Sequence, residues 1–298
     1  MTSTLETRQD TPPERPLRRR GDELRSRDHV ARIGLHAALF AGLVVMFGPF
    51  IWMALSSFKT EGEIRSDPPT FLPQNGTVDN YHTLFTRLDF PTFFTNSIVV
   101  AVLTTVGNLL FCSAAGYALA KLTFPGKRVL LLIVLGTIMV PSVVTMVPLF
   151  VLSSNLGLVN SLAGLILPFL AQAFGVFLMR QFIMSIPDDL LEAARIDGAG
   201  ELRIFWQIVL PLCRPALAAL SVLQVTWVYN NFFWAVAFMR TGDKLPVTSS
   251  LQNLRGQFFT DYNLLSAGSV IVAIPTLVIF FVLQRHLRAG LTLGATKG

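Results

Sequence analysis

Six long apolar runs dominate this sequence and limit what it can fold into. Each is long enough to cross a hydrocarbon layer of about 30 Å as a helix, which satisfies its own backbone hydrogen bonds there. Only 14% of the 298 residues are charged, against about a quarter in soluble domains. The sequence therefore predicts an all-α, polytopic membrane protein. We expect its six transmembrane helices at Gly34–Ser56, Asn96–Leu119, Val129–Leu152, Leu162–Ile183, Pro215–Phe238 and Leu264–Leu283.

Basic residues in the connecting segments predict how these helices are oriented. They gather before the first run, after the second, between the fourth and fifth, and after the sixth. By the positive-inside rule these parts, including both termini, lie in the cytoplasm. Residues 1–30 mix arginines with acidic residues and hold few large apolar side chains, so we expect a disordered tail there. Residues 31–298 then form one multi-pass transmembrane domain.

A polar segment punctuated by glycines, residues 185–213, separates the fourth run from the fifth. Ser185 and Asp188 have the spacing of a capping box, and Pro187 suits the first turn of a helix. We therefore expect a short helix to open at this point. The apolar positions on one side of it are Leu190, Ala193 and Ala194.

Two glycines, Gly198 and Gly200, are expected to end this first short helix, because glycine permits backbone angles that other residues resist. A second amphipathic helix follows, from about Glu201 to Leu210. Its apolar residues at helical spacing are Leu202, Phe205, Ile208 and Val209. The segment thus predicts a helix, a tight glycine turn and a helix at a membrane surface.

At the spacing EAAxxDGAxxxxxFxxIxLP, this segment resembles the EAA loop of permease subunits of bacterial ATP-binding-cassette importers. The resemblance implies the type I importer permease fold, with a coupling helix that docks in a groove of a cytoplasmic ATPase. The alternative is an ordinary cytoplasmic helical hairpin in which Glu192 pairs with Arg195. The matching residues, which the resemblance assigns to ATPase coupling, are Glu192, Ala193, Ala194, Asp197, Gly198, Ala199, Phe205, Ile208, Leu210 and Pro211.

Two further stretches resemble the carbohydrate-uptake branch of this family. Asp67 to Phe85 is similar to the branch's PPxxLP…T…NY..LF pattern. The ending Gly290 to Gly298 is similar to the GLTxGAxKG end of the smaller permease of maltose-type systems, which implies that it reaches the ATPase interface. A frayed terminus is the alternative for that ending.

The sequence contains no motif for chemistry of its own. HExxH, GxSxG and the phosphate-binding loop GxxxxGKT are all missing, so we expect the chain to be no enzyme and to leave ATP hydrolysis to another polypeptide. Cys112 and Cys213 lack any partner motif and are expected to be small buried hydrophobes, with no metal or disulfide. No cofactor is expected in this chain, and the resemblance implies that ATP and Mg²⁺ bind the partner ATPase.

Polar residues inside the apolar runs are candidates for a substrate path, because an unpaired amide in hydrocarbon is costly. Gln224, Trp227 and Asn231 are expected on one helical stripe, where amides would bond sugar hydroxyls and the ring would stack on a sugar face. The stretch Trp227 to Trp234 is also similar to the family's WNxFLW-like stretch. Interhelical hydrogen bonds, or an interfacial aromatic belt with Phe233 and Trp234, are the alternative. The candidate path is Gln172, Gln224, Trp227, Asn230 and Asn231.

Small residues and prolines predict how the helices meet and bend. The second run is rich in glycine, alanine and serine, which permits close helix contact in lipid. Pro141, Pro148 and Pro168 each free a backbone carbonyl, so they are either kinks that let helices rock during transport or static packing features.

Together these features predict a permease of a bacterial cell membrane that imports a sugar or related polyhydroxylated solute. The resemblance implies four partners: a second, related permease, a dimer of ATPases, an extracytoplasmic solute-binding protein, and the lipid bilayer around them. Nucleic acid is not expected. The alternative is an ion-coupled secondary transporter or channel, which as a rule needs carboxylates within the membrane, and the six runs hold none at mid-depth. A scaffold protein would explain the hydrophobicity but not the EAA pattern.

Overall fold

The computed structural model describes residues 18–239, 244–254 and 260–292. In these ranges the regular elements are helices and no strand occurs, which confirms the all-α prediction. The chain divides into two units, Met1–Trp52 and Met53–Gly298. The first unit holds most of one long helix, α1 (Arg18–Ser56), which starts well before the predicted Gly34. The expected disordered tail is therefore helical from Arg18, and residues 1–17 lie outside the described residues.

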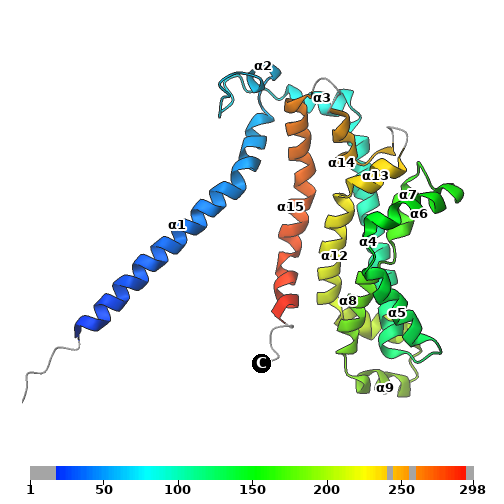
Figure 1. The fold of residues 1–298 in the computed structure, drawn as a ribbon. Helices are drawn as coiled ribbons and strands as arrows, with labels where there is room; N and C mark the ends of the chain where they lie inside the picture. The colour runs from blue at the N-terminus through cyan, green and yellow to red at the C-terminus, as the bar shows by residue number, and fades with distance from the viewer. Residues whose placement is uncertain (1–17, 240–243, 255–259, 293–298) are drawn as a thin grey trace, which may run out of the picture. The chain divides into compact units, whose positions relative to one another are not determined.

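The second unit is a bundle built on four helices (Figure 1). Helix α4 packs against α8 and α12, and α12 packs against α15. The short helix α9 lies at one end of this bundle, whereas α3, α13 and α14 lie at the other (Figure 1). The bounds are α3 Asp79–Arg87, α4 Phe90–Lys121, α8 Ala173–Met184, α9 Asp188–Ile196, α12 Arg214–Tyr229, α13 Phe232–Phe238, α14 Val247–Ser250 and α15 Tyr262–Thr292.

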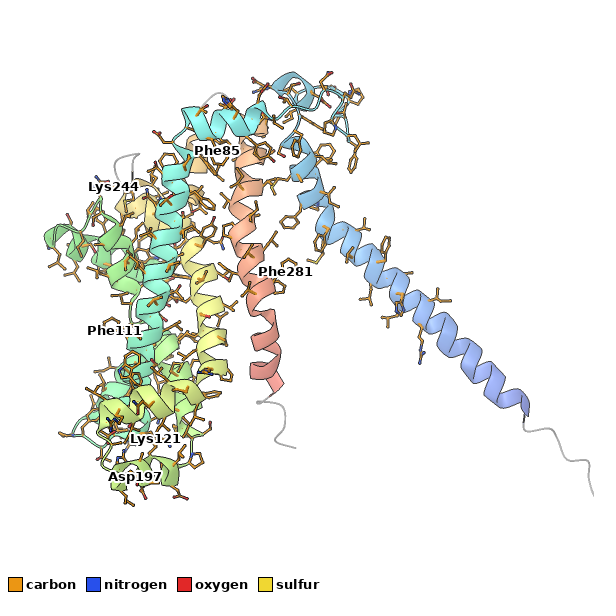
Figure 2. All side chains as sticks on the ribbon, turned by 180° about the vertical axis from the view of Figure 1, so that it is seen from behind. Phe85, Phe111, Lys121, Asp197, Lys244 and Phe281 are labelled. Atoms are coloured by element: carbon orange, nitrogen blue, oxygen red, sulfur yellow. The ribbon has the colours of Figure 1, made fainter. Side chains whose placement is uncertain are left out.

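The remaining described residues of this unit form further helices and the loops that connect them. A side view with all side chains places Lys121 and Asp197 at the α9 end, and Phe85 and Lys244 at the opposite end (Figure 2). The bounds of these helices are α2 Glu61–Ile64, α5 Lys127–Ile138, α6 Ser142–Asn155, α7 Leu162–Ile166, η1 Leu167–Phe169, α10 Glu201–Ile204, η2 Phe205–Val209, α11 Leu210–Leu212 and η4 Leu251–Leu254.

The contact between α4 and α8 depends on small residues, as the sequence predicted. A Cβ atom placed on Gly116 would lie 2.9 Å from both the Met179 Cβ and the Arg180 backbone nitrogen, and one on Gly175 would lie 2.7 Å from the Cys112 sulfur. These distances are too short for any real side chain. Glycine at both positions therefore lets the two backbones approach closely.

Among the described residues, four helical stretches are long and apolar enough to cross a membrane, and two bent helix pairs bring the total to six if each pair counts as one span. The stretches are Arg32–Ser56, Phe90–Lys121, Leu162–Met184 and Tyr262–Val282, and the pairs are Lys127–Ile138 with Ser142–Asn155, and Glu201–Leu212 with Arg214–Tyr229.

The third predicted span is not one straight helix. Helices α5 and α6 meet at an angle of 108°. Pro141 precedes α6 and has no backbone N–H, and a residue that precedes a proline is driven out of the helical region. Pro148, in contrast, lies within α6. Pro168 lies in the 3₁₀ turn η1 that separates α7 from α8, so two of the three prolines coincide with breaks.

The fifth predicted span is also interrupted. Helix α12 ends at Tyr229, and the separate helix α13 begins at Phe232. Asn230 and Asn231 leave the helical path, and the Asn231 side-chain oxygen accepts a hydrogen bond from the Trp234 backbone N–H at 3.4 Å. Asparagine side chains favour helix starts over helix interiors for this reason.

Two hydrophobic clusters fill the bundle, one toward each end. The cluster near α13 and α14 includes Val100, Phe169 and Trp234, and the cluster near α9 includes Tyr117 and Val209. Helix α4 contributes buried residues to both. Cys112 and Cys213 are fully buried in the second cluster, which confirms their assignment as small hydrophobes.

Candidate functional site

The EAA segment forms a helical hairpin with a defined turn. Helix α9 ends in a Schellman motif, in which the Ala199 N–H donates to the Ala194 carbonyl at 2.9 Å and the Gly198 N–H donates to the Arg195 carbonyl at 3.0 Å. Gly198 has φ +81°, in the left-handed region that favours glycine. The predicted glycine turn is therefore present at Gly198. Gly200 has φ −72° and needs no such freedom.

The start of the hairpin differs from the prediction. Helix α9 opens at Asp188, with Pro187 as its N-cap, and no side chain caps it. The Ser185 hydroxyl donates instead to the Phe182 carbonyl at 2.6 Å, at the end of α8. The capping box is thus absent because the end of the preceding helix, one turn away, takes the hydroxyl.

The second arm of the hairpin contains a π-helical turn, η2, between α10 and α11. Ile204 and Val209 are both fully buried and lie five residues apart, the repeat of a π-turn. Leu202, predicted on the buried face, is 78% exposed, whereas Ile204 in the same helical turn is fully buried. In the first arm Leu191 is buried, whereas Leu190 and Ala193 are exposed.

Two residues of α4 hold this hairpin by both arms. The Lys121 ammonium donates to the Ile186 carbonyl and to the Asp188 carboxylate, each at 2.6 Å, where the first arm begins. The Tyr117 hydroxyl donates to the Glu201 carboxylate at 2.5 Å, where the second arm begins. The other oxygen of Glu201 accepts from Arg195 at 2.8 Å, which ties the two arms to each other.

These contacts keep the carboxylates charged. The hydrogen bond from Arg195 lowers the pKa of Glu201, and that from Tyr117 lowers it further. Lys121 lowers the pKa of Asp188 in the same way, and Glu201 raises the pKa of Arg195. Each bond is therefore charge-assisted at neutral pH, although the exposure of Asp188 and Glu201 lets water screen both pairs. Arg195 pairs with Glu201, so the expected alternative pairing with Glu192 is not formed.

The outward face of the hairpin is left free by these contacts. Ile196 at the tip of α9 is 86% exposed. Of the predicted coupling residues, Phe205 is buried, Ala194, Ala199, Ile208 and Leu210 are half-buried, and Glu192, Ala193, Asp197, Gly198 and Pro211 are exposed.

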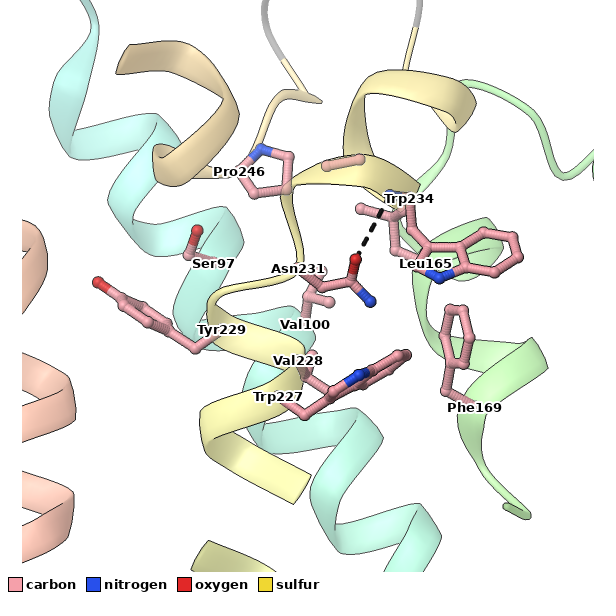
Figure 3. A pocket seen from close by; sticks show the side chains of 11 residues that line it. Ser97, Val100, Leu165, Phe169, Trp227, Val228, Tyr229, Asn231, Trp234 and Pro246 are labelled. Carbon is pink, nitrogen blue, oxygen red and sulfur yellow. Dashed lines mark hydrogen bonds between the residues drawn. The ribbon is translucent and has the colours of Figure 1, made fainter. Parts of the chain in front are cut away.

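A small cavity lies at the opposite half of the bundle, where α12 gives way to α13 (Figure 3). Phe169 meets Trp227 edge-on with ring centroids 5.0 Å apart and meets Trp234 at 5.2 Å. The Asn231 amide lies beside these rings, and Ser97 lies on its other side (Figure 3). The cavity has a volume of about 20 Å³, measured as the space that the centre of a water molecule can occupy. This is room for about one water molecule. The three rings therefore close this cavity to a sugar.

The predicted substrate path is only partly assembled in this state. Trp227 and Asn231 line the cavity. Gln224 and Trp227 lie three residues apart within α12, but Asn231 lies beyond the end of that helix, so the three residues do not form one helical stripe. Gln224 is buried on α12 outside the cavity lining, and its amide nitrogen has no partner among the described residues. Gln172 occupies the N-cap position of α8 without a side-chain capping bond, and Asn230 is exposed and donates to the Thr226 carbonyl.

A family model covers more than half of the chain. Residues 112–292 match the family described as "binding-protein-dependent transport system inner membrane component". The chain belongs to this family. The matched residues include the whole EAA hairpin and the α12–α13 break beside the cavity.

Individual permease proteins are similar to this chain over most of their length. The chain is 37% identical over 262 residues to the arabinooligosaccharides transport system permease protein AraQ of Halalkalibacterium halodurans, covering 87% of this chain and 94% of that protein. It is 34% identical over 266 residues to the diacetylchitobiose uptake system permease protein NgcG of Streptomyces coelicolor, covering 88% of each.

Solved structures agree with the family assignment. A bacterial ABC transporter involved in the import of the acidic polysaccharide alginate aligns with a TM-score of 0.76 at 26% identity, over 93% of this chain and 100% of that one. The methionine ABC transporter MetNI shares the fold alone, with a TM-score of 0.53 at 16% identity. The chain thus has the type I importer permease fold.

Sequence reasoning missed the residues of this permease that hold the hairpin and close the cavity. Tyr117 and Lys121 are four residues apart on one face of α4, a spacing that indicates a shared face but names no partner. Phe169 sits in the break after α7 and resembles any other apolar residue. The described residues contain no group of His, Cys, Asp or Glu that could hold a metal ion.

Proposed function

We propose that this permease carries a neutral sugar or related polyhydroxylated solute into the cytoplasm. The observation that carries this proposal is the cavity, where an amide and three aromatic rings converge at a helix break, since amides bond hydroxyls and rings stack on sugar faces. Related permeases named for arabinooligosaccharides, diacetylchitobiose and lactose support it. In the proposed path Phe169 and Trp234 join Gln172, Gln224, Trp227, Asn230 and Asn231.

Energy for this transport is proposed to come from a partner ATPase that binds ATP and Mg²⁺. The exposed face of α9, with Glu192, Ala193 and Ile196, supports docking there because it leaves an apolar tip and small side chains uncovered. ATP-driven closure of the ATPase dimer would move the hairpin, and the bundle would exchange an outward-open state for an inward-open one. Such coupling needs two discrete states that the nucleotide biases.

The assembly is proposed to contain a second, related permease and an extracytoplasmic solute-binding protein. The alginate transporter structure in complex with its periplasmic protein supports the latter partner by analogy of fold. The hairpin and both termini would face the cytoplasm of a bacterial cell, because basic residues gather on that side. The C-terminal residues 293–298, proposed to reach the ATPase interface, lie outside the described residues.

A pair of glycine variants tests the coupling proposal. Gly198→Asp forces a side chain into φ +81°, at a cost of about 1 kcal/mol or more, and distorts the turn that presents α9. Gly200→Asp adds the same charge two residues away at φ −72°, where any residue fits, and serves as the matched control. We expect the wild type and Gly200→Asp to co-purify in mild detergent with an ATPase and a second permease. Gly198→Asp should reach the membrane but lose the ATPase or its coupling.

Mass spectrometry of the co-purified proteins and sugar uptake by proteoliposomes give the readouts. ATP-dependent uptake of an arabino-oligosaccharide, chitobiose or lactose by the assembled complex would support the sugar class. Unchanged ATP-dependent uptake in Gly198→Asp contradicts coupling through the hairpin. Transport by the chain alone, without ATP, would replace the importer with an ion-coupled transporter or channel.

A further inference from the structure

The hairpin is fastened to one helix at two separated points. Lys121 holds the entry to α9, and its side chain is only 7% exposed although its partner Asp188 is 72% exposed. Tyr117 holds the start of α10, and its ring also packs on Phe205 with centroids 5.7 Å apart. Because Tyr117 and Lys121 are one turn apart on α4, both arms of the hairpin are fixed to the same rigid face.

The same helix reaches the cavity at the other end of the bundle. Ser97 and Val100 of α4 line the cavity, and the Ser97 hydroxyl accepts a hydrogen bond from the Val247 N–H at 2.8 Å, which joins α4 to α14. Asn96 donates to the Leu245 carbonyl at 3.3 Å in the same region. Helix α4 is therefore in direct contact with both the hairpin and the cavity.

Other routes from the hairpin to the cavity contain breaks. Along the chain, α10–α11 meets α12 at an angle of 77°, and α12 then ends before α13. Toward the N-terminus from the hairpin, α8 extends back only to its N-cap at Gln172. The 3₁₀ turn η1, which contains Phe169, lies before that point. A break absorbs displacement as a hinge does, whereas the 32-residue helix α4 is continuous from Phe90 to Lys121.

We propose that Tyr117 and Lys121 are positioning residues that couple the hairpin to α4, so that α4 carries displacement of the hairpin to the cavity. This inference rests on the proposed function, because it assumes that an ATPase moves the hairpin. The breaks at η1 and between α12 and α13 then serve as the hinges across which Phe169, Trp227 and Trp234 separate. Loss of either contact leaves the ATPase docked on the free face of α9 but lets the hairpin move without α4.

Isosteric variants of the two contacts provide the test in the reconstituted full complex. Tyr117→Phe removes one hydroxyl and keeps the ring on Phe205, and Lys121→Met removes the ammonium. The matched controls are Tyr262→Phe, at an exposed position on α15, and Lys127→Met, whose ammonium bonds only to the α4-end carbonyls of Ala120 and Leu122. The measurements are ATPase retention, ATP hydrolysis and sugar transported per ATP.

We expect both test variants to retain the ATPase and hydrolyse ATP while the sugar transported per ATP falls about fivefold or more, the lower end of typical coupling between sites. The controls should keep the wild-type ratio, and Lys121→Arg should restore much of it because a cation again reaches Asp188. A general loss of folding would lower hydrolysis and transport together and leave their ratio unchanged. An unchanged ratio in Tyr117→Phe and Lys121→Met overturns the inference, whereas a wild type without an ATPase overturns the proposed function.

A measurement on otherwise wild-type complex gives an independent outcome. Spin labels at Arg203→Cys on α10 and Val102→Cys on α4 report the distance between hairpin and helix. The native cysteines, Cys112 and Cys213, are buried, so the labelling reagent should not reach them. The inference expects this distance to stay constant between nucleotide-free and ATP-trapped complex. A second pair, Arg203→Cys with Val143→Cys on α6, should change its distance. A change in the first pair as large as that in the second contradicts transmission through α4.

Discussion

Two polar regions at opposite ends of the bundle are each organised around one glutamate, and they use it differently. Glu63 lies in residues 57–78 between α1 and α3, called the outer loop because they lie at the end of the bundle away from the hairpin (Figure 1). Glu63 is 9% exposed, and it accepts hydrogen bonds from the Gln74 N–H at 2.7 Å, the Thr70 hydroxyl at 2.9 Å and the Asn75 N–H at 3.4 Å. The Glu201 carboxylate in the hairpin is half-exposed and bonds to the side chains of Arg195 and Tyr117.

The lysines of the two regions differ in the same way, in burial and in the groups that they bond. Lys59 is 2% exposed and donates to the Thr70 carbonyl inside the outer loop. Lys121 reaches across from α4 to a hairpin carboxylate that is mostly exposed. The outer loop is thus fixed by buried bonds to its own backbone, whereas the hairpin is held as a unit by side chains from a neighbouring helix. This difference is what we expect if the outer loop is rigid and the hairpin moves as a unit.

The largest effect is expected from Asn80, which closes the outer loop. Its amide donates to the Ser57 carbonyl at 2.8 Å and the Lys59 carbonyl at 2.9 Å, and its oxygen accepts from Asn263 on α15 at 2.8 Å. Asn80→Leu keeps the branched shape at a larger volume and removes three hydrogen bonds, two of them buried, so we expect a loss of about 3 kcal/mol in unfolding free energy. Thermal unfolding in detergent measures it.

The exposed Asn75 provides the matched control for that variant, and Asn75→Leu should change stability by less than about 0.5 kcal/mol. Equal losses in the two variants would show that the outer loop is not fixed by buried bonds.

Acid should loosen the outer loop through Glu63. The backbone N–H of Gln74 is the main cause that lowers the pKa of Glu63 below its ordinary value of 4.5. A carboxyl whose pKa is lower in the folded state stabilises the fold above its unfolded pKa, and this stabilisation is lost as pH falls through the folded value. Amide hydrogen exchange of residues 57–80 should therefore accelerate below about pH 4.5.

Glu63→Gln should exchange faster at neutral pH and lose that acid dependence, because it carries no titrating group. Glu61→Gln, on the exposed side of the same helix, should keep the wild-type profile. If both variants titrate like the wild type, Glu63 is not the group that orders the loop.

The smallest effect is expected from salt, and mainly at the hairpin. Raising ionic strength from about 0.1 to 1 M shortens the screening length from about 10 to 3 Å. This weakens the ion pairs Lys121–Asp188 and Arg195–Glu201, whose carboxylates are exposed. Hydrogen exchange of residues 188–204 should rise by less than about tenfold. Residues 57–80 should respond less, because Glu63 is buried and bonded to backbone N–H groups, and the exposed ion pair there, Arg65–Glu61, joins residues only four positions apart. An equal response would remove the contrast between the regions.

The sequence alone predicted the structural features that depend on residues near one another in the chain. Apolar length predicted the helical spans, the small residues of α4 predicted a close helix contact, and Gly198 predicted the turn of the hairpin. Each of these depends on a residue and its near neighbours, either through the length of an apolar run or through backbone angles that glycine alone adopts with ease. The EAA pattern located the hairpin for the same reason, since its residues are consecutive in the chain.

Only the tertiary structure decided which distant groups meet. Tyr117 and Glu201 are 84 residues apart, and nothing local to either one selects the other. The π-turn at Phe205–Val209 brought Ile204 and Val209 to the buried face at a five-residue spacing that regular helical periodicity does not predict, and the break at Asn230 separated Gln224 from Asn231. Helical periodicity predicts a face only while the helix stays regular. A single widened turn or break redirects every residue beyond it, and packing against other segments decides where such irregularities are stable.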